Sequence, residues 1–134
     1  MDTLDEKIDS FLAAPSFGVV GASDDPRKYG NKVYRTYLSH KRTAYPINPS
    51  VSTVLGNPAY ANLAALPEKV ESVSVITPPA VTEKVVEEAI KMGVKNIWMQ
   101  PGAESDKAVR AAEEAGINVI HGGPCLLVVM GYHE

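Results

Sequence analysis

The chain has 134 residues and a formal net charge of −3, with 45% hydrophobic and 22% charged residues, which is typical of one folded domain. No apolar run approaches the roughly 20 residues that span a bilayer, and the acidic N-terminus lacks the positive charge of a signal peptide. A single cysteine, Cys125, excludes an internal disulfide, so we expect a cytoplasmic protein without a membrane segment.

Residues 3–13 are the first predicted helix. Thr3 and Glu6 have the spacing of a capping box, and Pro15 marks the end of the helical pattern. The apolar side chains of this segment recur at helical spacing, at Leu4, Ile8, Phe11 and Leu12. We therefore expect residues 1–15 to form a packing helix that covers a sheet.

Residues 16–23 predict a strand followed by a tight turn. An apolar run ending at Val20 has the composition of a strand buried on both faces, and the small residues Gly21, Ala22 and Ser23 follow it. A strand, a small-residue turn and a helix form the phosphate-binding corner of doubly wound domains, because the backbone and the helix N–H groups can approach an anion. The spacing differs from the G-x-G-x-x-G fingerprint. Ser23 is either the N-cap of the next helix or a phosphate donor.

The rest of the chain alternates between helical and strand patterns. Helical patterns cover residues 28–39, 61–66, 79–92 and 104–115, and strand patterns cover residues 43–47, 70–77, 94–99 and 117–121. Gly93 and Gly116 each stand between a helix and a strand, as in parallel sheets. We predict a single α/β domain over residues 1–134, a Rossmann-like doubly wound sheet of about five parallel strands in three α/β/α layers. The apolar tail within residues 122–134 is expected to pack back on the domain or on a neighbouring subunit.

Charge is distributed unevenly along the chain. No acidic residue occurs from Pro26 to Pro67, whereas the same stretch holds Arg27, Lys28, Lys32, Arg35, Lys41 and Arg42. This block is either a solvated helix face or a site for a small polyanion beside the predicted phosphate turn. Nucleic acid fits less well, because aromatic residues are few, the remainder of the chain is acidic and no nucleic-acid motif occurs.

Two nucleotide ligands fit this turn to different extents. A site for NAD places an acidic residue at the end of the second strand, where this chain has Ile47-Asn48-Pro49. NADP tolerates the positive charge, but a chain of this length leaves little room for a substrate region. Coenzyme A suits the pattern better, because its 3′-phospho-ADP end carries roughly four negative charges and its long pantetheine arm can leave a small domain.

Several blocks in register resemble the small stand-alone CoA-binding proteins, which are similar to the N-terminal domain of the succinyl-CoA synthetase alpha subunit. These blocks are residues 20–23, 26–30, 45–49, 89–93, 98–102 and 111–116, with Gly56, Tyr60 and Leu63. The resemblance implies a Rossmann-like fold that binds CoA without a known reaction. It implies phosphate contacts from Gly21, Ala22, Ser23 and Arg27, and an adenosine frame from Pro46, Ile47, Asn48, Thr77, Pro78 and Pro79.

Other residues have two interpretations each. Asn48 either bonds the adenosine or holds the proline corner around it, and Tyr29 either lines the site or packs the helix. Lys32 is expected to contribute to the electric field, and Gln100 is placed facing the cleft. The resemblance is weaker after the third strand, where stand-alone relatives often have an arginine and this chain has Thr77, and in the tail, which lacks the charged residues usual in the family.

We expect no metal site and no catalytic residue, and enzymatic activity is left open. Cys125 stands four residues after His121, so it is either a nucleophile or a bystander thiol. Two alternatives to a simple CoA-binding protein stay open. One is an NAD(P)-binding oxidoreductase-like protein or an acyl-transfer enzyme, and the other is a synthetase-like domain that acts with a partner chain or as a homo-oligomer through the apolar tail.

Overall fold

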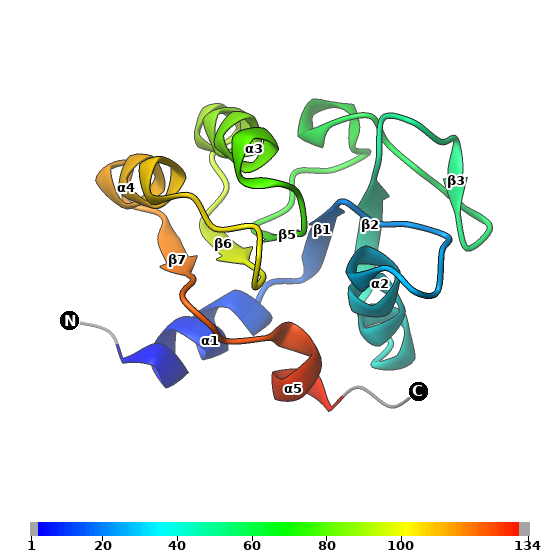
Figure 1. Ribbon diagram of the computed structural model, residues 1–134, viewed down its shortest axis with the longest axis horizontal. Helices are drawn as coiled ribbons and strands as arrows, with labels where there is room; N and C mark the ends of the chain where they lie inside the picture. The colour runs from blue at the N-terminus through cyan, green and yellow to red at the C-terminus, as the bar shows by residue number, and fades with distance from the viewer. Residues whose placement is uncertain (1–2, 132–134) are drawn as a thin grey trace.

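The computed structural model describes residues 3–131 and contains one five-stranded parallel sheet flanked by helices (Figure 1). The sheet strands are β1 (Ser16–Val20), β2 (Thr43–Ile47), β5 (Ser72–Val75), β6 (Asn96–Met99) and β7 (Asn118–Ile120). The helices are α1 (Leu4–Leu12), α2 (Tyr29–Ser39), α3 (Pro79–Met92), α4 (Asp106–Glu114) and α5 (Leu126–Met130). The predicted Rossmann-like α/β fold is confirmed, and residues 132–134 of the predicted tail lie outside the described residues.

The order of the strands determines where a ligand can bind. The sheet runs β2-β1-β5-β6-β7, so the chain builds outward from β1 in one direction and from β5 in the other. The carboxyl ends of parallel strands share one edge, and the crevice of a doubly wound sheet opens where the strand order reverses. That point lies here between β1 and β5.

Helices cover both faces of the sheet (Figure 1). α1, α2 and α5 lie on one face, and α3 and α4 lie on the other. The core under α1 and α2 is aromatic: the Phe17 and Tyr37 rings stack with centroids 4.7 Å apart, and Trp98 meets Phe11 edge-on at 5.4 Å. The helix predicted over residues 3–13 therefore covers the sheet as expected. Its capping box is present, with the Glu6 amide donating to Thr3 Oγ1 at 3.2 Å.

The segment between β2 and β5 is more structured than its sequence indicates. A small hairpin, β3 (Thr53–Val54) and β4 (Asn57–Pro58), turns at Leu55 and Gly56, which both have positive φ angles. The predicted helix over residues 61–66 is a short 3₁₀ turn, η1 (Leu63–Ala65). Between them, the Tyr60 amide donates to the Pro46 carbonyl at 3.0 Å, which extends the sheet past β2 by one bridge. This connection brings residues 60–63 beside the carboxyl edge.

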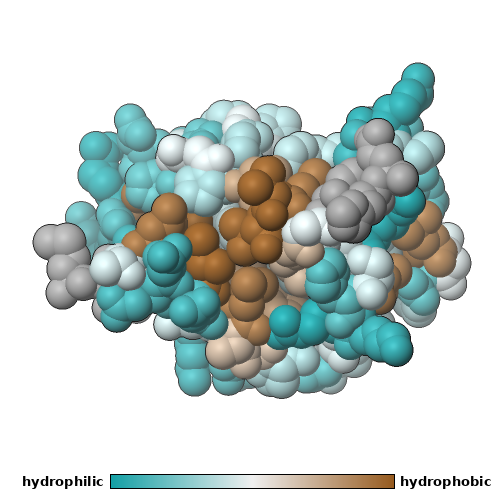
Figure 2. All heavy atoms as spheres, turned by 90° about the horizontal axis from the view of Figure 1, so that it is seen from below, coloured by the Kyte–Doolittle hydropathy of each residue, from teal (hydrophilic) through white to brown (hydrophobic). Residues whose placement is uncertain are grey.

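The apolar tail packs on the domain along one side only. Leu126, the first residue of α5, is fully buried, whereas Val128 of the same helix is 80% exposed. Figure 2 shows hydrophobic side chains gathered on the face that α1 and α5 cover, where Leu4 and Val129 are also exposed. The tail thus contributes both to the core and to an exposed apolar surface. Among residues 3–131, no helix is long and apolar enough to cross a membrane.

Candidate functional site

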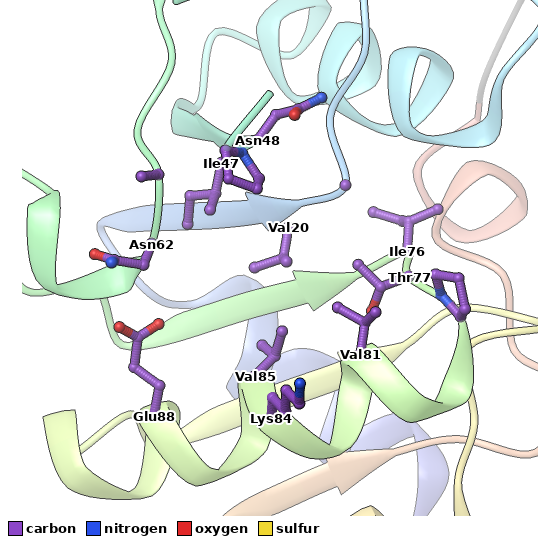
Figure 3. Close-up of a pocket in the computed structure, with 14 residues that line it drawn as sticks. Val20, Ile47, Asn48, Asn62, Ile76, Thr77, Val81, Lys84, Val85 and Glu88 are labelled. Atoms are coloured by element: carbon purple, nitrogen blue, oxygen red, sulfur yellow. The ribbon is translucent and has the colours of Figure 1, made fainter. Parts of the chain in front are cut away.

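A cleft of about 520 Å³ opens at the carboxyl edge of the sheet, next to the ends of β1, β2 and β5 (Figure 3). Val20 and Ile47 from the strand ends and Ile76 just after β5 supply apolar surface. From the opposite wall, Val81 and Val85 of α3 point toward Val20 in Figure 3. The cleft therefore presents apolar walls to a ligand at the crevice where doubly wound sheets bind nucleotides.

Polar groups of α3 complete the cleft. Glu88 accepts hydrogen bonds from the backbone amides of Leu63 at 2.9 Å and Ala64 at 3.4 Å, so its carboxylate holds η1 against α3. Lys84 is the one cation lining the cleft within the described part of the chain. The sequence reasoning missed both residues. A signal was present, because a helix that begins at Pro79 must place its first turns beside the carboxyl edge.

The turn after β1 is held by two close backbone approaches. Gly21 has a φ of +98°, and a Cβ there would lie 2.4 Å from the carbonyl oxygen of Ile76. A Cβ on Gly30, in the first turn of α2, would lie only 1.8 Å from the carbonyl oxygen of Gly21. Glycine is therefore required at both positions, because a side chain would push the helix and β5 away from the turn. The sequence correctly predicted a tight small-residue turn here, and Gly30 explains how α2 reaches it.

The loop between this turn and α2 is fixed by its own side chains. Ser23 Oγ accepts from the Asp25 amide at 3.0 Å, and Asp25 accepts from the Arg27 amide at 2.9 Å. The expectation that Ser23 caps the helix is wrong, because α2 begins at Tyr29 with Lys28 as its N-cap. Five residues, 24–28, separate Ser23 from Tyr29, the first residue of α2.

Arg27 and Asp25 form a bidentate pair in this loop, in which Arg27 is exposed and Asp25 is partly buried. The Arg27 guanidinium donates through Nε and Nη2 to the two Asp25 carboxylate oxygens, both at 3.0 Å. The hydrogen bonds from Arg27 lower the pKa of Asp25 to about 2, and the Arg27 side chain is 89% exposed. The guanidinium thus stands at the turn with its fork occupied by a carboxylate, and an incoming phosphate would compete with Asp25 for it.

The six cations of the acid-free stretch do not gather in one place. Arg27, Lys28 and Lys32 lie at the start of α2, near the turn, whereas Lys41 follows its far end. Arg42 is structural: Nη2 donates to the carbonyl oxygens of Leu12 and, at 3.0 Å, Ala14, and the guanidinium lies 4.7 Å from the centroid of the Phe17 ring. Since helices in this fold run from one sheet edge to the other, only the first three cations are at the candidate site.

The ends of β2 and β5 place the predicted adenosine frame. Asn48 lines the cleft, but its Nδ2 donates to the Ala22 carbonyl at 2.9 Å and its Oδ1 accepts from the Ser50 amide. The amide of Asn48 therefore joins the turn to the proline corner, as the second of its two interpretations predicts. Thr77 also lines the cleft, and its hydroxyl pairs with that of Thr82 at 2.8 Å.

Tyr29 and Gln100 lie away from the cleft, under α5. Gln100 is fully buried, and its Oε1 accepts from the Tyr29 hydroxyl at 3.3 Å and from the Leu126 amide at 3.0 Å. Tyr29 also contacts Cys125. The placement of Gln100 facing the cleft is wrong, because the glutamine follows β6, one strand beyond the switch point, and turns toward the α2 and α5 side.

The structure thus divides the predicted site into groups. The cleft itself is lined by Gly21, Ile47, Asn48, Thr77 and Pro78. Ala22, Ser23 and Arg27 belong to the adjoining loop, Pro46 lies within β2, and Pro79 is the exposed first residue of α3. Tyr29, Lys32 and Gln100 lie on the α2 side. Within residues 3–131, no group of three or more His, Cys, Asp or Glu residues is close enough to hold a metal ion.

Known proteins resemble this chain in sequence and in fold. The family described as CoA binding domain matches residues 15–131. The chain is 28% identical over 118 residues to the ADP-forming acetate–CoA ligase I of Archaeoglobus fulgidus, which covers 81% of this chain and 17% of the ligase. It is 26% identical over 137 residues to the alpha subunit of the ADP-forming acetate–CoA ligase II of Pyrococcus furiosus, which covers 94% of this chain and 30% of the subunit. The chain therefore spans less than a third of either relative.

A solved structure of similar size matches more completely. A hypothetical protein from Pyrococcus horikoshii superposes with a TM-score of 0.88 at 31% sequence identity. The match covers 95% of this chain and 89% of that one. Unlike the ligases, this protein is therefore matched over most of its own length.

Proposed function

Because the chain belongs to the CoA-binding domain family, we propose that it binds coenzyme A, or an acyl-CoA, through the 3′-phospho-ADP moiety. The observation that carries the proposal is the contact of Gly30 with the Gly21 carbonyl, which brings the start of α2 to the mouth of the cleft. In the described chain, α2 has no side-chain cap and no acidic residue in its first turn. A helix start of this kind offers free N–H groups and a partial positive charge to an anion.

The two parts of the ligand would occupy adjoining surfaces. The diphosphate is assigned to residues 21–23 and the start of α2, with Arg27 as the charged partner. The adenosine is assigned to the apolar cleft, between Ile47 on one side and Pro78 on the other. Lys84 then supplies a positive charge inside the cleft, which favours a ligand that carries a 3′-phosphate.

Isothermal titration with CoA and with dephospho-CoA tests this assignment. CoA is expected to bind about tenfold more tightly, because only CoA carries the additional phosphate charge. Arg27→Ala should weaken CoA binding about tenfold, the loss of one charge-assisted hydrogen bond. The matched control is Arg35→Ala, an exposed arginine of α2 whose loss should leave affinity unchanged. Undetectable binding of CoA alongside binding of NADP would replace this proposal by the oxidoreductase-like alternative.

A second candidate is a synthetase-like domain that works with a partner chain. The exposed apolar surface over α1 and α5, to which the 80% exposed Val128 contributes, favours it. Light scattering of the protein and of its Val128→Ser variant tests this candidate. An assembly that dissociates in the variant supports a docking role for α5, and a monomer in both cases contradicts self-association through this surface.

A further inference from the structure

Three side chains meet at the carboxyl edge outside the cleft. Gln100 follows β6, Tyr29 opens α2, and Cys125 precedes α5. The Tyr29 hydroxyl contacts both Gln100 Oε1, at 3.3 Å, and the Cys125 sulfur. We call these residues the thiol cluster. It contains the only cysteine of the chain, and the nucleotide site proposed above makes no use of it.

The thiol cluster contains a hydrogen-bond donor with no acceptor. Gln100 is fully buried, and within residues 3–131 its Nε2 has no partner. The orientation of the amide is fixed, because the backbone N–H of Leu126 can only donate and points at Oε1, at 3.0 Å. An unpaired buried donor costs about 1–3 kcal/mol, so it indicates a position where an acceptor atom belongs.

The cysteine is held near the Gln100 side chain by the chain around it. Trp98 Nε1 donates to the Pro124 carbonyl at 3.0 Å, and Gln100 binds the Leu126 amide, so residues on both sides of Cys125 are fastened to the end of β6. Cys125 is partly exposed. Burial raises the pKa of the Tyr29 hydroxyl, which therefore keeps its proton and can donate it.

The thiol cluster lies within reach of a ligand bound in the cleft. Backbone hydrogen bonds join the residues that follow neighbouring strands: the Ile76 amide donates to the Val20 carbonyl, and the Gln100 amide donates to the Val75 carbonyl. With strands about 4.8 Å apart, Gln100 lies two strands, or about 10 Å, from Gly21. Tyr29 directly precedes Gly30, which touches the same turn. The pantetheine arm of a CoA whose phosphates lie at the turn can therefore reach Cys125.

We propose that Cys125 accepts an acyl group from the thioester of an acyl-CoA, with Gln100 Nε2 donating to the thioester oxygen. The cysteine sulfur attacks the carbonyl carbon and forms a new S–C bond, and the C–S bond to CoA breaks. The proton of the cysteine thiol passes to the departing CoA sulfur, with the Tyr29 hydroxyl as carrier. The products are S-acyl-Cys125 and free CoA, and no oxidant is consumed.

The unpaired donor favours a thioester over a disulfide. A carbonyl oxygen becomes more negative as the sulfur adds to it, and a preplaced N–H donor then stabilises it most. A disulfide offers no such oxygen, so exchange with a CoA disulfide would leave Gln100 Nε2 unpaired. This inference rests on the proposed CoA binding only because the pantetheine arm of a bound acyl-CoA would bring the thioester to Cys125. The acyl transfer itself depends on the thiol cluster alone.

Acetyl-CoA and intact-protein mass spectrometry test the proposal. The native chain should gain one acetyl group that neutral hydroxylamine removes, and Cys125→Ala should gain none. The native thiol should react at least about a hundredfold faster than the same thiol in the urea-unfolded chain, the contribution of preplaced donors. An equal rate in the native and unfolded chains overturns the proposal.

Two variants test the donors separately. Gln100→Glu keeps an acceptor for the Leu126 amide but removes the Nε2 donor, and Tyr29→Phe removes the hydroxyl at a half-buried position. Each should slow acylation at least about tenfold. If Gln100→Glu does not fold, Tyr29→Phe decides, and a rate unchanged by Tyr29→Phe contradicts the proposed proton path.

Acetyl-pantetheine, which lacks the nucleotide, separates this inference from the proposed function. Acylation of native Cys125 by acetyl-pantetheine, in a protein that fails to bind CoA by titration, supports the thiol cluster and refutes the nucleotide site. Tight binding of CoA, with no acylation by either thioester beyond the rate of the unfolded chain, refutes the thiol cluster and retains the nucleotide site.

Discussion

The two edges of the sheet use polar groups in opposite ways. At the amino edge, Ser72 donates to the Phe11 carbonyl at 2.8 Å, Asn96 donates to Ser72 at 3.0 Å, and Asn118 donates to Asn96 at 3.0 Å. This ladder crosses β5, β6 and β7, and a second bond of Asn118 joins it to the Lys7 carbonyl of α1. Each side-chain donor of the ladder has an acceptor among the described residues, although the acceptor Asn118 Oδ1 is itself buried without a donor.

The carboxyl edge is built differently. There the start of α2 has no side-chain cap, an apolar cleft stays open, and the buried Nε2 of Gln100 is unpaired, all within the described residues. Polar groups that are paired stabilise a fold, whereas unpaired ones cost free energy unless a ligand supplies the partner. The comparison teaches that polar side chains at the amino edge stabilise the fold, whereas polar groups at the carboxyl edge are available to a ligand.

The largest expected effect is that of Gly30→Ala at the carboxyl edge. A Cβ 1.8 Å from the Gly21 carbonyl oxygen must move α2 away from the turn. We therefore expect the free energy of unfolding to fall by more than about 3 kcal/mol and CoA binding to be lost. Urea denaturation and titration measure both. Gly116→Ala is the control: its φ is +82° but its surroundings are open, so about 1 kcal/mol is lost and affinity is retained. Equal effects of the two variants would contradict the close approach.

The amino edge should respond in stability alone. Ser72→Ala leaves the buried Asn96 amide without its acceptor and removes one of the donors to the Phe11 carbonyl, which should lower the free energy of unfolding by about 1–3 kcal/mol. CoA affinity should stay the same. The control, Ser39→Ala, removes an exposed hydroxyl and should cost less than about 0.5 kcal/mol. A change in CoA affinity in Ser72→Ala would show that the two edges are coupled.

Lys84 tests the charge of the cleft. Lys84→Glu places a negative charge where the nucleotide is assigned, and CoA affinity should fall at least about tenfold, with a weaker effect on dephospho-CoA. Lys91→Glu changes the net charge equally from the same helix, two turns further from the cleft, and should change affinity less than about twofold. Titration at low and high salt measures both variants. A similar loss in each would mean that only overall charge matters.

The smallest effect is expected at Asp25. Its pKa is lowered from 3.8 to about 2 by the hydrogen bonds from Arg27, so the pair stabilises the loop above about pH 4 and ceases to do so as the pH falls toward 2. CoA binding between pH 5 and 8 should therefore not depend on this carboxyl group. Asp25→Asn frees the Arg27 guanidinium and should raise CoA affinity about twofold by titration. A loss of affinity would show that Arg27 needs Asp25 to hold its position.

Local patterns in the sequence predicted most of the fold. The capping box at Thr3, the small residues after β1 and the glycines between helices and strands act through neighbouring backbone, so their effects can be read without knowing the rest of the chain. The hairpin between β2 and β5 was not predicted, because it depends on Leu55 adopting a positive φ angle, and the apolar tail was not predicted to be helical, because α5 spans only Leu126–Met130.

The tertiary structure alone decided how side chains distant in sequence are combined. A run of six cations looks continuous in the sequence, yet Arg42 turns to the end of α1, and Lys84, which was not predicted, lines the cleft. The thiol cluster joins Tyr29 to residues 71 and 96 positions away. The physical reason is that strand order places Gln100 and Cys125 beside α2, and neither helical nor strand periodicity carries information about strand order.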